Sequence, residues 1–522
     1  MAVREGVNIV VSGTIDRIAS YHLTLRALDG VTGNALDKSE VTAETKQEVL
    51  SAVGRAAADL RKALGDTTPM STQLAAAETY TAGSLEAAHE YALGQDLFFR
   101  GKFDDAARHY EQAIKIDPNL GRAYAGLAAS YNNMGRLSDA EAEYKRALSH
   151  IDRMSDREKF RTRATYYLVT HNNARAIEEL TQLVKQYPAD MSALINLPIA
   201  YFYNRDMSRA VEEAQRAITA YPKNYVARNN AALYAMYAGD FTNALRQAQT
   251  VLSMNPAYLK AYVAIALSQL GENDVASATE TYKRLATQSA AGQSMAAAGL
   301  ADVALYEGRS ADAAAILKQG VDRDRAEKRT DAANRKLATL AWAAGDVSAA
   351  EEVMATNTRD EHALYTAAHA LIEAGREKRA LAIASRLDAQ LEPELQHYGK
   401  LIEGEAFLKR GQAREAVAKF EEARHLADSW PARFDRGLGN LALGAFAEAD
   451  ADFETCVKRR GEATAVFLDD VPSFHFFPPV YYYLGRAQEG LGSASAVNSY
   501  KQFVAIKTKG DGDPLVADAR RR

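Results

Sequence analysis

Few residues of this chain have the types and spacing that catalysis or metal binding requires. His362 and His369 are seven residues apart and would share a helix face, but no third ligand follows at metal spacing. Cys456 is the single cysteine and has no matched histidine partner, which favours a buried apolar thiol. Asp469 and Asp470 form an acidic pair typical of a solvated turn. We therefore predict no metal site and no cofactor.

Two short stretches match catalytic motifs in sequence but lack the flanking elements that these motifs require. Residues 504–507 read VAIK, the strand lysine motif of protein kinases, but no glycine-rich loop precedes them and no HRD or DFG sequence occurs. Residues 437–442 read GLGNLA, a weakened dinucleotide fingerprint, but no predicted strand precedes them. We interpret Gly437 as a small packing residue and predict that the chain is not an enzyme.

Composition narrows the class of protein further. The 522 residues exceed what one core usually serves, and the net charge of −5 provides no basic field for nucleic acid. No apolar run approaches the roughly 20 residues that span a bilayer, and the start MAVREG lacks a signal peptide. We expect no nucleic-acid partner, no membrane span and a cytoplasmic location as encoded. The location would be extracytoplasmic if the chain is part of a longer membrane-anchored protein.

The elements that carry these residues follow a repeat. Pro188, Pro222 and Pro256 are spaced 34 residues apart, a period typical of helix–turn–helix solenoids. Two early units match at eight positions in register. These positions are Leu93, Gly94, Leu97, Gly101, Phe103, Ala106, Tyr110 and Ala113 in the first unit, and Leu127, Ala128, Tyr131, Gly135, Leu137, Ala140, Tyr144 and Ala147 in the second.

Each repeated residue type has a physical role. A small residue such as Gly94 lets two helices approach closely, and Gly101 provides the positive φ of the turn between them. Ala106 fills the tight crossing point, and Tyr110 fills the space between successive repeats. These residues resemble the tetratricopeptide repeat (TPR) family, which implies a mainly α-helical TPR solenoid.

Later units keep the same glycine and alanine spacing. Anchored on these pairs, about twelve repeats cover residues 84–509, and the unit around Ala350 has a short second helix. The pairs are Gly239 and Ala244, Gly308 and Ala313, Gly345 and Ala350, Gly375 and Ala380, Gly411 and Ala416, and Gly444 and Ala449.

The ends of the chain follow other patterns. Residues 1–66 alternate with period two and then become amphipathic, which predicts a small, partial α/β domain of the order β-β-β-α. Residues 67–83 are rich in Thr, Ala, Ser and Gly and read as a linker. Residues 510–522 remain as a C-terminal tail.

The TPR resemblance also implies a partner and a surface. In that family the inner helix of each repeat lines a concave groove that binds a protein or peptide. Asparagine and tyrosine suit such capture, although any exposed solenoid face carries them as well. The register implies Tyr91, Gln95, Phe98, Arg122, Asn132, Asn133, Arg161, Asn196, Tyr203, Asn229 and Tyr237 as partner-binding residues. The lysine–asparagine clamp for a terminal carboxylate is absent in register, which disfavours a chaperone-tail ligand.

One aromatic segment allows two interpretations. Residues 474–483 read FHFFPPVYYY, the densest aromatic run of the chain. It could be a hot spot for a partner, or it could seal the core at the last repeat, where no further repeat covers the face. We favour the second interpretation.

A second resemblance concerns the ends of the chain. Residues 2–7, 12–15 and 25–29, together with 478–486 and 509–515, resemble the C-terminal region of bacterial, especially acidobacterial-type, membrane serine/threonine kinases and related winged-helix regulators. In that family a small α/β domain precedes a TPR array. Our leading hypothesis is a non-enzymatic TPR scaffold. The alternative is the sensory half of such a kinase or transcription regulator, detached from its effector domain.

Overall fold

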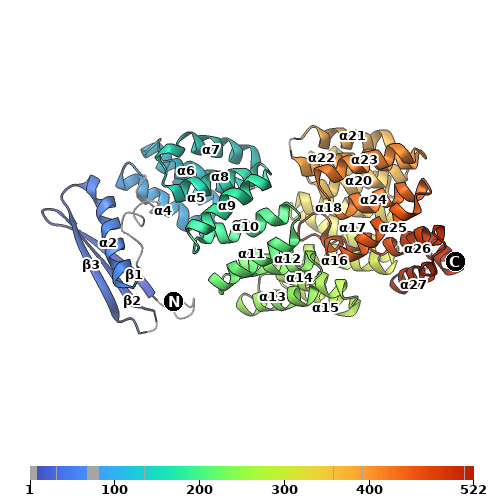
Figure 1. The fold of residues 1–522 in the computed structure, drawn as a ribbon, viewed down its shortest axis with the longest axis horizontal. Coiled ribbons are helices and arrows are strands. Elements are labelled where there is room, and N and C mark those ends of the chain that lie inside the picture. Colours follow the sequence, from blue (N-terminus) through green and yellow to red (C-terminus); the bar gives the residue numbers. More distant parts are fainter. Residues whose placement is uncertain are drawn as a thin grey trace. The chain divides into compact units, whose positions relative to one another are not determined.

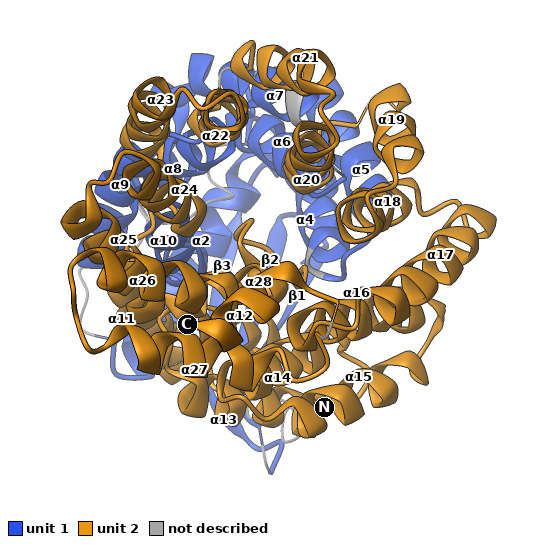
Figure 2. Ribbon diagram, turned by 90° about the vertical axis from the view of Figure 1, so that its right-hand side faces the viewer, with its two compact units in different colours: residues 1–204 blue, residues 205–522 orange. Residues whose placement is uncertain are grey.

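The computed structural model describes residues 9–30, 32–66, 82–134, 136–356, 358–390, 392–510 and 512–522. Most of the predicted linker, residues 67–81, lies outside these ranges. The chain forms two compact units, residues 1–204 (unit 1) and residues 205–522 (unit 2), coloured separately in Figure 2.

Unit 1 begins with the predicted β-β-β-α segment. Strands β1 (Ile9–Arg17), β2 (Tyr21–Asp29) and β3 (Ala35–Ala43) form an antiparallel sheet in sequence order (Figure 1). A short 3-10 turn, η1 (Lys46–Glu48), leads into helix α2 (Val49–Ala63). Leu23 of the central strand is buried with Val49 and Ala52 of α2, so the helix covers one face of the sheet.

The rest of unit 1 is built from helix–turn–helix pairs (Figure 1). Its helices are α4 (Leu85–Phe99), α5 (Phe103–Ile116), α6 (Gly121–Asn133), α7 (Leu137–Ser149), α8 (Asp156–Val169), α9 (Asn173–Gln186) and α10 (Met191–Tyr203), with the 3-10 turn η3 (Ile151–Arg153) before α8.

Unit 2 continues the same arrangement. Figure 2 shows its helices following one another around an arc. They are α11 (Met207–Ala220), α12 (Tyr225–Tyr237), α13 (Phe241–Met254), α14 (Leu259–Gly271), α15 (Val275–Ala286), α16 (Ala290–Glu307), α17 (Ser310–Ala326), α18 (Thr330–Ala344), α19 (Val347–Ala355), α20 (Glu361–Glu373), α21 (Glu377–Asp388), α22 (Pro393–Lys409), α23 (Ala413–Leu426), α24 (Trp430–Ala442), α25 (Phe446–Lys458), α26 (Pro479–Gly490), α27 (Ala496–Ile506) and α28 (Pro514–Arg521).

Local chemistry repeats with the helices. Asp206, Asp240 and Asp274 are 34 residues apart, and each caps the second helix of its pair by accepting a hydrogen bond from the third backbone N–H, at 3.0–3.2 Å. The short second helix predicted around Ala350 is confirmed, because α19 has only nine residues. Within the predicted tail, residues 514–521 form a helix.

The packing roles predicted for the repeat are confirmed. The turn glycines at 101, 239, 308, 345, 375, 411 and 444 all have φ between 63° and 90°, and the paired alanines are fully buried. A Cβ on Gly94 or Gly126 would lie within 2.8 Å of the Tyr110 ring, so that ring fills the space between two repeats. Gly437 has the same role toward Phe453, at 2.7 Å. Gly135 lies outside the described residues.

One segment of unit 2 departs from the repeat. Residues 459–478, which we call the insert, connect α25 to α26 and contain the 3-10 turns η4 (Arg460–Ala465) and η5 (Phe474–Phe476).

We call the first helix of each pair the inner helix: α4, α6, α8 and α10 in unit 1, and the even-numbered helices α12 to α26 in unit 2. The insert packs on α12, α14 and α16, all of which are inner helices. Among the helices of the described residues, none is long and apolar enough to cross a membrane.

Candidate functional site

Three of the predicted partner-binding residues lie together on the inner helices of unit 1. Gln95 donates from Nε2 to the hydroxyl of Tyr91 at 2.8 Å, one turn away on α4. Arg122 of α6 donates from Nη1 to the hydroxyl of Thr162 on α8 at 3.3 Å. Tyr91 is only 2% exposed, and burial raises its pKa although the charge of Arg122 opposes this. Tyr91 of α4 also forms a side-chain hydrogen bond with Arg122 of α6. Through Arg122 and Thr162, these polar contacts connect the three successive inner helices α4, α6 and α8.

Arg161 has a partner inside its own unit. Its guanidinium contacts the buried carboxylate of Asp190, with Nη2 at 2.7 Å from Oδ2. Asp190 also accepts a hydrogen bond from Ala193 at 2.9 Å, so it caps α10. Burial would raise the pKa of Asp190, but the charge of Arg161 and its hydrogen bonds outweigh burial and hold the pKa below its usual value. Arg161 therefore helps to fix the start of α10.

The other predicted residues of unit 1 are more separated. Phe98 is half-buried, whereas Asn132 and Asn133 are exposed at the end of α6. Asn196 donates from Nδ2 to a serine hydroxyl one turn earlier at 3.2 Å. Tyr203 is 46% exposed at the end of α10, which leaves much of its ring accessible. Contact of these residues with a partner stays a prediction.

The two predicted residues of unit 2 are buried. Asn229 and Tyr237 of α12 are 1% and 2% exposed. The Tyr237 hydroxyl donates to the backbone oxygens of Ala465 and Asp469, the latter at 3.1 Å. Burial raises the pKa of Tyr237 well above its usual value. The inner face of α12 therefore contacts a segment of the chain itself, the insert.

The acidic pair of the insert is bound by two inner helices. Asp470 forms an ion pair with Lys260 of α14. Asp469 lies 3.4 Å from Arg335 of α18, and burial raises the Asp469 pKa to about 7 although Arg335 opposes this. The prediction that this pair is a solvated turn is wrong, because both carboxylates bind the insert to basic side chains.

Aromatic rings carry the apolar part of the same contact. Phe467 stacks on His362 of α20, with ring centroids 4.4 Å apart, and packs against Tyr398 of α22 at 5.3 Å. Phe474 stacks on Tyr306 of α16 at 5.3 Å. Stacked and tilted ring pairs of this kind add to the stabilisation that burial gives. The insert is therefore held by rings that come from three inner helices.

A buried polar clamp fixes η5. His475 donates its backbone N–H to Asp302 Oδ1 of α16 at 2.9 Å, and its ring Nδ1 lies 2.7 Å from the same oxygen. The ring of His475 also packs on Trp342 at 4.7 Å. The aromatic run that begins at Phe474 thus enters the interior of unit 2 at α16 and α18. Our prediction that it seals the last repeat misplaced its first residues, although their burial is confirmed.

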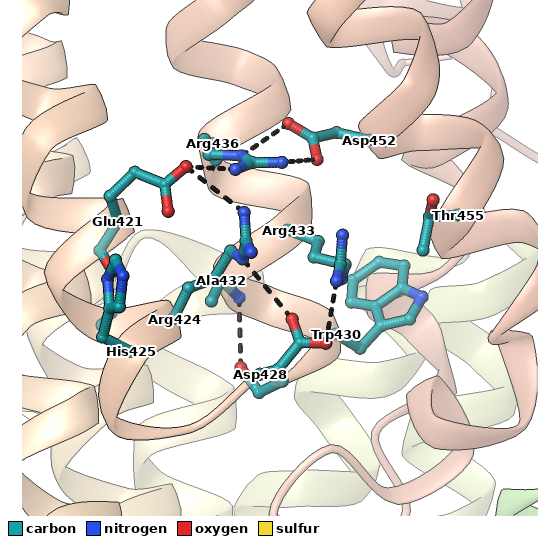
Figure 3. A network of polar contacts seen from close by, with 12 residues as sticks. Glu421, Arg424, His425, Asp428, Trp430, Ala432, Arg433, Arg436, Asp452 and Thr455 are labelled. Atoms are coloured by element: carbon teal, nitrogen blue, oxygen red, sulfur yellow. Dashed lines mark hydrogen bonds and ion pairs between the residues drawn. The ribbon is translucent and has the colours of Figure 1, made fainter.

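A polar network fixes α24 behind this region (Figure 3). Arg436 bridges Glu421 of α23 and Asp452 of α25, and Figure 3 shows its guanidinium between the two carboxylates. Trp430 donates from Nε1 to the carbonyl of Cys456 at 2.9 Å. Cys456 is fully buried, as the sequence predicts, and burial raises its pKa well above the usual value. These bonds orient the face of α24 that carries Trp430.

The sequence did not predict that the insert binds to the inner helices α12, α14 and α16. The available signal was the spacing of turn glycines, because Gly492 follows Gly444 by 48 residues where the period is 34. Its aromatic composition was a second signal. Within the described residues, no group of three or more His, Cys, Asp and Glu side chains could hold a metal ion.

Two family models match the repeat region of the chain. Tetratricopeptide repeat models match residues 97–153 and residues 161–225, 229–294 and 299–356. The chain is therefore a TPR α-solenoid with an N-terminal sheet and helix. TPR folds generally mediate binding to proteins or peptides.

Relatives resemble parts of the chain. Hsp70-Hsp90 organizing protein 2 of Arabidopsis thaliana is 45% identical over 56 residues, which is 10% of this chain and 10% of that protein. The chain thus spans about a tenth of this curated relative. A tetratricopeptide repeat protein from Parabacteroides merdae is 17% identical over 48% of this chain and 97% of its own, with a TM-score of 0.34. A thermophilic TPR protein in Thermus thermophilus is 19% identical over 35% of this chain and 99% of its own, with a TM-score of 0.31.

Proposed function

We propose that this chain is a non-enzymatic scaffold that binds an extended protein or peptide segment along the inner helices of unit 1. The observation that carries the proposal is the insert. In unit 2 the inner helices hold residues 459–478, a non-repeat segment, through ion pairs, hydrogen bonds to its backbone and ring stacking. The same fold thus provides an internal example of peptide capture.

The inner helices of unit 1 have the chemistry for a similar ligand. Gln95 and Arg122 supply hydrogen-bond donors, and the Nε of Arg122 is a buried atom without a hydrogen-bond partner among the described residues. Tyr203 supplies accessible aromatic area. Guanidinium and amide donors bind backbone carbonyls and carboxylates, and tyrosine adds rigid contact area. We infer a partner segment that carries acidic and aromatic residues, as the insert does.

Site-specific photo-crosslinking in cells tests the proposal. Tyr203 is replaced by p-benzoylphenylalanine in the full chain, and a matched variant carries the same residue at Ile116, which is 44% exposed at the end of α5. Helix α5 is the second, outer helix of its pair. The proposal predicts a discrete protein adduct from position 203 and none from position 116. Equal adducts from both positions, or an adduct from position 116 alone, would contradict it.

The second hypothesis, a detached sensory half of a kinase or regulator, stays a prediction of the sequence resemblance. Part of the resemblance, residues 2–7, lies outside the described residues. A kinase or DNA-binding domain encoded in frame upstream would support this hypothesis, and it is compatible with peptide binding by unit 1.

A further inference from the structure

Unit 2 contains a cavity that the proposed function does not use. Its volume is about 500 Å³, within the range of small-molecule sites. Most of the wall comes from the inner helices α18, α20, α22, α24 and α26 and from the insert, and α23 and α28 add one residue each, Phe420 and Leu515. None of the lining residues belongs to unit 1.

Aromatic rings form much of the cavity wall. Trp430 and Phe434 stack on α24 with centroids 5.2 Å apart, and Phe434 meets Tyr483 of α26 edge-on at 5.8 Å. Trp342 of α18 packs against Phe476 of the insert at 5.5 Å. The electron-rich faces of such rings attract cations, and tryptophan does so most strongly. The wall is therefore suited to an apolar body that carries a positive charge.

The charged side chains of the cavity pair with one another except for one. His369 Nδ1 lies 2.7 Å from Glu405 Oε2. Lys409 lies 2.9 Å from Glu373, and both are exposed, which places this pair at the mouth. Asp435 is 6% exposed and forms no ion pair in the part of the chain that the structure describes. Its hydrogen-bond partner is the hydroxyl of Tyr365 at 3.4 Å.

A buried carboxylate without a countercharge is costly, and a ligand can supply the missing charge. We propose that this cavity binds a small organic cation, with its ammonium group against Asp435 and its apolar body against Trp342, Trp430 and Phe434. The positions of these rings are fixed from behind: the network of Arg436 holds α24, and the clamp of His475 on Asp302 holds the insert.

Binding of a cation at Asp435 is coupled to proton release. Burial and the negative charge of Glu405 raise the Asp435 pKa well above its usual range, while the positive charge of His369 opposes them. A bound cation favours the ionised carboxylate, so affinity rises as the pH rises through the Asp435 pKa. The titratable groups that line the cavity with Asp435 are Tyr365 and His369 of α20, Glu373 at its mouth, Glu405 and Lys409 of α22, His475 of the insert and Tyr483 of α26.

Tryptophan fluorescence of the full chain provides the test, because both tryptophans of the sequence, Trp342 and Trp430, line the cavity. Three probes share a benzyl body: benzyltrimethylammonium, benzyl alcohol and phenylacetate. We expect a saturable response that is strongest for benzyltrimethylammonium and that tightens from about pH 5 to about pH 8 for this probe alone. No saturable response to the cation, or equal affinity for all three probes, overturns the proposal without any variant.

Two variants locate the cation. Asp435→Asn is expected to weaken benzyltrimethylammonium about tenfold, with benzyl alcohol unaffected. Glu448→Gln, an exposed carboxylate on α25 outside the cavity, serves as the matched control and leaves both affinities unchanged. Unchanged affinity of Asp435→Asn for the cation overturns the proposal. These outcomes are independent of the crosslinking result at Tyr203, because no residue of unit 1 takes part.

Discussion

At the scale of residues, the repeat depends on positions where a Cβ cannot fit. The ring of Tyr110 lies between two repeats because Gly94 and Gly126 leave room on either side. The pattern of small residues and tyrosines in the sequence predicted this contact, since spacing alone identifies residues that recur in register. A single added Cβ at Gly94 or Gly126 would therefore disturb the packing of one repeat against the next.

Gly126→Ala tests this packing. The new Cβ would lie 2.5 Å from the Tyr110 ring, so the ring or the helix must shift. We expect a loss of about 1–3 kcal/mol in the free energy of unfolding, measured by urea denaturation. Gly512→Ala is the control, because nothing lies within 4 Å of its Cβ. A loss below about 0.5 kcal/mol for Gly126→Ala would show that this space is not tight.

A buried ion pair in unit 2 provides a second test. Lys336 lies 2.6 Å from Asp324 and 3.0 Å from a serine hydroxyl, and the Lys336 and Asp324 side chains are 4% and 0% exposed. Lys336→Met leaves the buried carboxylate with only the more distant Arg329, 3.7 Å away, so we expect a loss of about 3 kcal/mol in the free energy of unfolding. Lys283→Met, which removes an exposed pair with Glu280 at 3.9 Å, should cost at most about 1 kcal/mol. Equal effects of the two variants would argue against the buried pair.

At the scale of elements, the insert packs on the inner helices α12, α14 and α16. Its clamp at η5 depends on Asp302, which accepts from both the backbone and the ring side of His475. Asp302→Ala removes this acceptor and should increase proteolytic cleavage within residues 459–478 about tenfold, measured by limited proteolysis with mass spectrometry. Asp312→Ala on α17, which breaks an exposed pair with Arg309, is the matched control. Cleavage at the wild-type rate in Asp302→Ala would contradict this role.

The contact of α20 with α22 should depend on pH. Burial opposes the charged form of His369, but the carboxylate of Glu405 outweighs it and raises the His369 pKa to about 9 from an ordinary value near 6.5. Because the folded-state pKa is the higher one, this pair stabilises the fold fully below about pH 6.5 and loses its contribution as the pH rises through about 9. The difference in free energy of unfolding between the wild type and His369→Gln should therefore shrink from about pH 6 to about pH 10. His425→Gln, an exposed histidine on α23, should show no such change.

The sequence predicted helices and turns well, and it predicted the insert poorly. Turn glycines such as Gly239 and crossing alanines such as Ala244 act within one repeat, so a fixed period reveals them. Tyr237 contacts Ala465 across 228 positions of sequence. A repeat period of 34 residues carries no information about a contact of that range. The sequence therefore predicted that Tyr237 binds a partner and that Asp469 lies in a solvated turn.

At the scale of the whole molecule, two TPR units with different inner faces lie on one chain. The inner helices of unit 2 hold the insert and enclose the cavity at Asp435, and those of unit 1 carry the accessible Tyr203. We expect the two units to divide their roles, with peptide binding in unit 1 and cation binding in unit 2.

The most direct test of the central claim is hydrogen exchange with mass spectrometry on the full chain, with and without the partner identified by crosslinking at Tyr203. Binding along the inner face predicts that the partner slows exchange in the inner helices α4, α6, α8 and α10 and leaves exchange in the outer helices α5, α7 and α9 unchanged. Protection confined to the outer helices, or to the sheet of β1 to β3, would contradict the claim that the inner face of unit 1 is the binding surface.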